Sequence, residues 1–128
     1  MNVTHVRAVL FAKHLDKVAA FYVGALGFER MSGDRDHTIL RCDDFDLVVH
    51  QIPKAIADTI AIADPPKRRT SGAIRLDFPV ASVDDARKRA RSLGGDVDDA
   101  PPPWAAHDKS FFLGYDPEGN QFGLSRRS

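Results

Sequence analysis

Asp116-Pro117-Glu118-Gly119-Asn120 is the stretch that decides how this sequence is interpreted, and it lies between the aromatic run 110–115 and the closing run 121–124. Proline fixes one backbone angle, while Gly119 and Asn120 tolerate left-handed backbone, so the stretch is typical of a tight reversal between antiparallel strands. Such turns occur in many folds and carry no chemistry by themselves. The position of this turn is informative, because the turn lies near the end of the second of two similar halves of the chain.

The second half of the chain predicts a strand, a helix and three further strands. Residues 73–80 alternate between apolar and polar positions, and residues 83–93 keep an apolar stripe at helical spacing after Ser82, a good N-cap. Pro79 cannot donate to a sheet ladder, so we expect it near a strand end or a sheet edge. The remaining strands are expected at 95–98, 109–115 and 120–126, with a proline-broken loop over 99–106.

The first half shows the same order of elements. Residues 5–12 alternate as a strand, and the apolar positions of 15–26 recur at helical spacing before Gly27, which suits the left-handed residue beyond a helix end. Short strands are expected at 28–31, 37–42 and 46–52. An offset of 68 residues carries Arg7 onto Arg75, so the halves form a structural repeat.

The repeat predicts an α+β fold in which two βαβββ modules pack together in one domain. Module one spans residues 1–53, a linker spans 54–72, and module two spans 73–128. Neither module of about fifty residues would bury its sheet face alone, so we expect the pair to enclose a space between curved sheets.

The amino-acid composition limits the kinds of molecule that the protein is expected to bind. Eighteen basic residues balance eighteen acidic ones among 128, so no global field favours nucleic acid or an anionic membrane. No apolar run approaches the roughly 20 residues of a membrane span, and the single cysteine, Cys42, cannot form an intramolecular disulfide. We expect a cytoplasmic protein. The basic trio 67–69 is interpreted as solvated surface, with phosphate binding as the alternative.

The sequence at this point resembles the vicinal oxygen chelate superfamily, the group of glyoxalase I, bleomycin-resistance proteins and extradiol dioxygenases. The resemblance covers nearly the whole chain and rests on Leu15-Asp16-Lys17-Val18-Ala19-Ala20-Phe21-Tyr22, Leu26-Gly27-Phe28, Val80-Ala81-Ser82-Val83-Asp84-Asp85-Ala86 and the turn 116–120. It implies that the two modules form a half-open barrel around a cavity, frequently completed in a homodimer. It also implies that enzymes of the group hold a divalent metal on strands of both modules.

The family's metal-ligand positions fall, by this resemblance, at Arg7, Arg75, Gly123 and approximately Val48. None of these side chains offers the imidazole, carboxylate or thiolate lone pairs that divalent metals need. The expectation is therefore a family fold without the standard metal site and without a cofactor. The alternative is a displaced divalent-metal site held by His5 and His50, which share strand faces with Arg7 and Val48.

Two alternatives remain for the arginines that the fold would direct into the cavity. They pair internally with Asp77, Asp46 or Glu118 in place of the lost metal, or they anchor a carboxylate or phosphate of a small ligand. The candidate ligand-binding residues are Arg7, Arg75, Asp77, His50, Trp104 and Tyr115.

The leading hypothesis is a metal-independent small-molecule-binding protein of the glyoxalase/bleomycin-resistance type, acting as a homodimer on an anionic or aromatic ligand. The alternative is an enzyme, namely a lyase, isomerase or dioxygenase. It would use either a displaced metal, or acid-base catalysis by His50 or Asp77 beside an arginine that stabilises an enolate. The sequence leaves open whether the protein is an enzyme.

Overall fold

The computed structural model describes residues 2–105 and 107–127. Its first half contains β1 (Val6–Ala12), α1 (Leu15–Leu26), β2 (Glu29–Gly33), β3 (His37–Cys42) and β4 (Phe45–Gln51). A connector with the short helix α2 (Lys54–Ala57) leads to the second half. That half contains β5 (Leu76–Val80), α3 (Val83–Ser92), β6 (Asp96–Val97), the 3-10 turn η1 (Pro103–Ala105), β7 (Phe111–Tyr115) and β8 (Gln121–Arg126).

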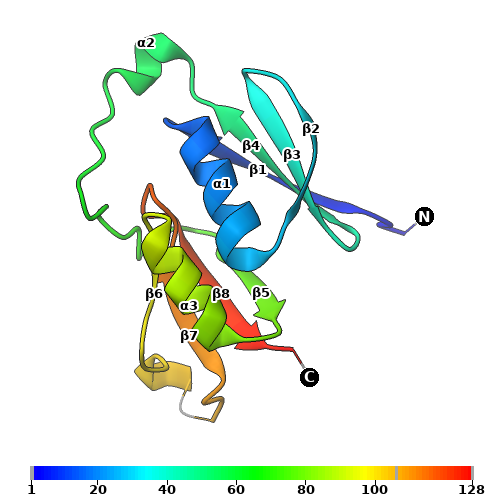
Figure 1. Ribbon diagram of the computed structural model, residues 1–128, viewed down its shortest axis with the longest axis vertical. Helices are drawn as coiled ribbons and strands as arrows, with labels where there is room; N and C mark the ends of the chain where they lie inside the picture. Colours follow the sequence, from blue (N-terminus) through cyan, green and yellow to red (C-terminus); the bar gives the residue numbers. More distant parts are fainter. Residues whose placement is uncertain (1, 106, 128) are drawn as a thin grey trace.

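The two halves form two four-stranded sheets of the same topology, in the orders β1-β4-β3-β2 and β5-β8-β7-β6 (Figure 1). The first strand of each module runs parallel to the last one, and the other pairs are antiparallel. Val9 lies beside Val48 in the first sheet, and Asp77 lies beside Gly123 in the second. The prediction of two βαβββ modules is confirmed, and in the described chain they form an open arrangement rather than a closed barrel.

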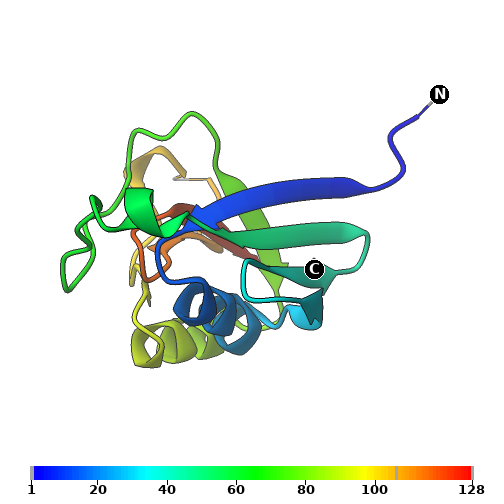
Figure 2. The ribbon, with the colours of Figure 1, turned by 90° about the horizontal axis from the view of Figure 1, so that it is seen from above.

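Both long helices cover the same side of the two sheets. Figure 2 shows α1 and α3 side by side beneath the strands, and the two helices contact each other. The fully buried Phe21 of α1 meets the fully buried Phe122 of β8, with ring centroids 5.9 Å apart. One core therefore joins the modules, as expected for units that could not bury their sheet faces singly.

Local signals set the helix ends. The left-handed Gly27, with φ of 81°, ends α1, and its N–H donates to the carbonyl of Val23. The hydroxyl of Ser82 accepts the N–H of Asp85 at 3.1 Å and so caps α3 as predicted. In module two the left-handed glycine is Gly94, one residue before the position that the repeat offset assigns.

The middle of the chain differs from the predicted strand over 73–80. β5 begins only at Leu76, and residues 73–75 extend from the connector. In the described part of the chain β5 pairs with β8 alone, so it is an edge strand, as Pro79 requires. Every helix in the described residues is too short or too polar to qualify as a membrane span.

The turn 116–120 joins the modules as well as its own two strands. The buried carboxylate of Asp116 accepts the backbone N–H groups of Glu118 and Asn120, the Asn120 side-chain amide and the Tyr22 hydroxyl of α1, at 2.8 to 3.1 Å. Burial raises the pKa of Asp116, and the four donors oppose that rise. Burial and the neighbouring Asp116 raise the pKa of Tyr22 well above its ordinary value.

Glu118, only 5% exposed, supplies the missing cap of α1. Its two carboxylate oxygens accept the backbone N–H groups of Lys13 at 2.8 Å and His14 at 2.7 Å. Among the residues that the structure describes, the side chain of His14, at the N-cap position, makes no capping hydrogen bond. The side-chain oxygen of Gln51 accepts the N–H of Leu15 at 3.1 Å. The start of α1 is thus capped by residues from β4 and from the far end of the chain.

Candidate functional site

The strand register fixes three of the four family ligand positions in space, and the fourth, Arg75, lies one residue before β5. Because Val9 and Asp77 are separated by the repeat offset and face Val48 and Gly123, Val48 is the structural equivalent of Gly123. These strand positions lie on the outer faces of the two sheets, away from the helices. The side chains on each outer face therefore determine which ligand the site could bind.

On module one a cluster of basic side chains surrounds the fully buried carboxylate of Asp46. Arg41 donates to both oxygens at 2.7 and 3.1 Å, the His5 ring lies at 3.0 Å, and an Arg7 terminal nitrogen lies at 3.6 Å. The hydrogen bonds from Arg41, followed by that from His5, hold the pKa of Asp46 well below its usual range. Arg7 is therefore a member of an internal ion cluster, the first of the two alternatives drawn from the sequence.

On module two Arg75 pairs with Asp77 through two hydrogen bonds of 2.7 and 3.0 Å. This pairing raises the pKa of Arg75, so its guanidinium stays charged. The same guanidinium lies over the rings of Trp104 and Phe111, 5.2 and 5.1 Å from their centroids. Trp104 is 63% exposed. Arg75, Trp104 and Phe111 form what we call the aromatic shelf.

Asp77 occupies the space that a longer side chain at position 123 would need. A Cβ built on Gly123 would collide with Oδ1 of Asp77 and approach the Phe111 ring to 2.6 Å. Real Cβ atoms essentially never come that close to another atom. The family's carboxylate position is therefore filled from the neighbouring strand by the partner of Arg75.

A second pair of this kind lies on the same face of module two. Arg68 binds Asp98 through two hydrogen bonds of 2.9 and 2.8 Å, and its guanidinium lies 4.9 Å from the centroid of the Tyr115 ring. Between this pair and Trp104 lies a hollow of about 700 Å³ walled by Leu113 and the proline segment 101–103. The sequence interpretation missed Arg68 and Asp98, because the basic trio was expected to be solvated and thirty residues separate the partners.

His5 and His50, the two histidines of the displaced-metal alternative, do not lie close to each other. His5 contacts Asp46, whereas His50 lies four residues further along β4, about 13 Å away at the rise of a strand. The His50 ring stacks on His37 with centroids 6.4 Å apart, and its Nδ1 lies 3.0 Å from the Gln51 carbonyl oxygen. The described residues contain no group of three histidine, cysteine or acidic side chains placed to hold a metal ion.

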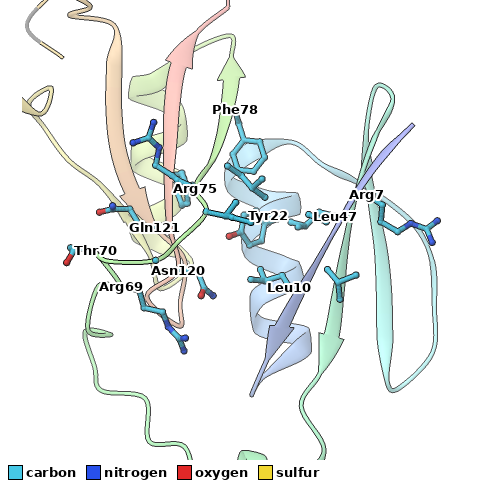
Figure 3. Close-up of a pocket in the computed structure, with 16 residues that line it drawn as sticks. Arg7, Leu10, Tyr22, Leu47, Arg69, Thr70, Arg75, Phe78, Asn120 and Gln121 are labelled. Atoms are coloured by element: carbon cyan, nitrogen blue, oxygen red, sulfur yellow. The ribbon is translucent and has the colours of Figure 1, made fainter. Parts of the chain in front are cut away.

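The structure divides the six predicted ligand-binding residues between the two sheets. Arg75, Asp77, Trp104 and Tyr115 lie together on module two, while Arg7 and His50 lie on module one. Figure 3 shows the Arg7 and Arg75 side chains pointing in opposite directions from the groove that separates the modules. Both arginines border this groove, but their side chains point away from it in opposite directions.

Paired βαβββ modules with this register define a protein of the vicinal oxygen chelate type. A family model for the glyoxalase-like domain matches residues 7–125, and the chain belongs to that family. No protein of curated function matches the chain.

Several solved structures share the fold over nearly the whole chain. A glyoxalase-related enzyme from Fulvimarina pelagi is 19% identical, with 99% of this chain and 89% of that chain covered and a TM-score of 0.68. The fosfomycin resistance protein FosX from Listeria monocytogenes is 16% identical, with 100% and 94% covered and a TM-score of 0.66. A bleomycin-binding protein from Streptomyces verticillus, solved with copper(II)-bleomycin, is 22% identical, with 100% and 99% covered and a TM-score of 0.61. At these identities the likeness establishes the fold alone.

Proposed function

We propose that this protein binds a small aromatic molecule, without a metal, on the outer face of module two. The observation that carries the proposal is the exposed indole of Trp104, held by Arg75 and Phe111 above a hollow of about 700 Å³. A volume between about 300 and 1,000 Å³ is typical of sites for drug-sized ligands. A flat ring would stack on the indole while its edge contacts Leu113 and the proline segment 101–103.

The charges of this face favour an aromatic ligand over an anionic one. Both guanidinium groups of the face, Arg75 and Arg68, already bind a carboxylate through two hydrogen bonds each. An anionic ligand would have to displace Asp77 or Asp98 or share its arginine. The anion expected from the sequence is therefore a weaker candidate here than an uncharged or cationic aromatic group.

The ligand positions themselves support the proposed metal independence. Arg7 and Arg75 carry guanidinium groups, which have no lone pair to give to a metal, and Val48 and Gly123 carry no donor atom. The guanidinium groups of Arg7 and Arg41 beside Asp46 would also repel a cation at close range.

We further propose that a second copy of the chain covers this site in a homodimer. The outer face of module one leaves large apolar side chains in solvent, with Val9 50% and Phe11 61% exposed beside His50. Exposed apolar patches of this kind mark interaction surfaces. A cytoplasmic location is part of the proposal, since the one thiol, Cys42, is exposed and unpaired.

The test uses Trp104, the only tryptophan of the chain, as the reporter. Metal-free bleomycin and 2-naphthol are titrated against the purified protein while tryptophan emission and thermal stability are followed. At least one probe is expected to change the emission and to raise the melting temperature. Trp104→Ala should abolish that stabilisation and Trp104→Phe should keep part of it, whereas the control Ile56→Ala, on exposed α2, should bind as the wild type does.

Unchanged binding in Trp104→Ala would refute the aromatic shelf as the site. The enzyme alternative has its own readout, because native mass spectrometry of protein purified without chelator reports any bound metal together with the mass of the assembly. One Zn, Mn, Fe or Ni ion per chain, lost on His5→Ala or His50→Ala, would overturn metal independence and favour a lyase, isomerase or dioxygenase.

A further inference from the structure

A groove between the edge strands β1 and β5 has a chemistry different from that of the aromatic shelf. Its volume is about 620 Å³, and Figure 3 shows it between the two sheets, with Tyr22 of α1 between the strands. Its floor is apolar and is built from Leu10, Leu47, Phe78, Phe122 and the ring of Tyr22. The Tyr22 hydroxyl is occupied by Asp116 at 2.9 Å, so its ring contributes mainly apolar surface.

Polar groups gather at one end of this groove. Thr70, Asn120 and Gln121 line that end together with Arg69. The backbone of Arg69 is fixed there, because its N–H donates to the Gly119 carbonyl at 2.8 Å and Arg69 pairs with Asn120 in a parallel bridge. The position of Arg69 is thus set by the turn 116–120, whose shape Asp116 and the left-handed Gly119 determine.

Arg69 differs from the other two arginines that border the groove. Arg7 contacts Asp46, and Arg75 binds Asp77. Within residues 2–105 and 107–127, no carboxylate lies within ion-pair distance of Arg69, and no acidic residue lines the groove. Glu118, in the adjoining hollow, is committed to the backbone N–H groups of Lys13 and His14.

We infer that this groove binds a small monocarboxylate with an apolar body, and that the Arg69 guanidinium receives the carboxylate. The apolar floor takes the body of the ligand, and the planar guanidinium fork matches the two oxygens of a carboxylate. One unpaired cation at the end of an apolar groove balances a single negative charge.

The groove adjoins the hollow of the site proposed above, since Thr70 and Gln121 line both, but the residues expected to hold the ligand differ. Leu76 and Phe78 of β5 face the groove, whereas Asp77 between them faces the outer side of the sheet beside the aromatic shelf. Trp104 does not line the groove. Either site can therefore exist without the other, and failure of one test leaves the other proposal standing.

Isothermal titration with 4-phenylbutyrate and with its uncharged amide, 4-phenylbutanamide, tests the inference. The acid is expected to bind with a dissociation constant at least about tenfold lower than that of the amide. The reason is that the amide cannot make the charge-assisted bidentate contact with the guanidinium group. Arg69→Gln should bring the affinity for the acid to that of the amide, and Arg69→Lys should fall between them. Arg89→Gln, on the exposed side of α3, is the matched control and should bind both probes as the wild type does.

A heteronuclear NMR titration locates the acid within the protein. The amide signals of Ala8, Leu10 and Ile74, which line the groove and not the hollow beside Trp104, should shift, while the indole N–H signal of Trp104 should stay in place. Equal affinities for acid and amide, unchanged binding in Arg69→Gln, absence of binding at millimolar acid, or a shift confined to the Trp104 indole would each overturn the inference.

Discussion

Replacing Glu118 by alanine removes both acceptors that cap the start of α1. The wild-type carboxylate accepts two backbone N–H groups, from Lys13 and His14, at 2.8 and 2.7 Å, and its residue is 5% exposed. Hydrogen bonds to a charged group contribute about 1.5 to 3 kcal/mol each. At the lower end of that range, Glu118→Ala should lower the free energy of unfolding by about 3 kcal/mol.

Urea unfolding followed by far-UV circular dichroism measures this loss. With an m value of about 1.5 kcal/mol/M, a loss of about 3 kcal/mol moves the midpoint down by about 2 M. Glu118→Gln keeps one acceptor oxygen and should lose about half as much. Asp58→Ala is the control, because Asp58 is exposed and pairs only with the exposed Lys54 at 2.8 Å, a contact worth less than about 1 kcal/mol.

The reasoning fails if Glu118→Ala unfolds at the same urea concentration as Asp58→Ala. That result would mean that water satisfies the start of α1 as well as Glu118 does. A large loss in Glu118→Ala together with an equal loss in Glu118→Gln would assign the effect to the charge near the helix N-terminus rather than to the count of acceptors.

Three further predictions concern contacts between the modules and within each of them. Tyr22→Phe removes the hydrogen bond to Asp116 and should cost about 1 to 3 kcal/mol in urea unfolding, and a cost below about 0.5 kcal/mol would show that the bond is not needed. The folded-state pKa of Asp46 lies below its unfolded value of about 3.9, so its contribution to stability is present above that pH and lost as the pH falls. Asp46→Asn should therefore be destabilised at pH 7, with a gap to the wild type that narrows below about pH 4, and a gap independent of pH in acid unfolding curves would contradict this. Gly123→Ala should lower the thermal midpoint by several degrees, since its Cβ collides with Asp77, and an unchanged midpoint would mean that the Asp77 side chain moves away freely.

The sequence by itself determined the order of elements and the bounds of the main helices. The apolar period before Gly27 predicted α1 over 15–26, and the cap Ser82 predicted the start of α3, because these signals act within one turn of helix. The 68-residue repeat and the turn 116–120 predicted the two modules. Strand starts were less accurate, since residues 73–75 alternate like a strand but find no partner.

Only the tertiary structure decided which charged groups meet. Asp46 and Asp77 pair with Arg7 and Arg75, as two of the three alternatives from the sequence had it, whereas the third candidate, Glu118, accepts the backbone N–H groups at the start of α1. His14 gives α1 no local cap, and this is the one feature of the sequence that indicates a distant acceptor for the N–H groups at the start of the helix.

The division of the site residues between the two sheets has the same physical cause. Arg68 reaches Asp98 across thirty residues, and Arg69, its neighbour in the chain, is left to border the groove. Local patterns fix the strand faces on which side chains lie, but ion pairs form between segments that become neighbours only when the modules pack. The sequence therefore predicted that Arg7 lies on the first strand, and the packing determined that Arg69 remains free to meet a ligand.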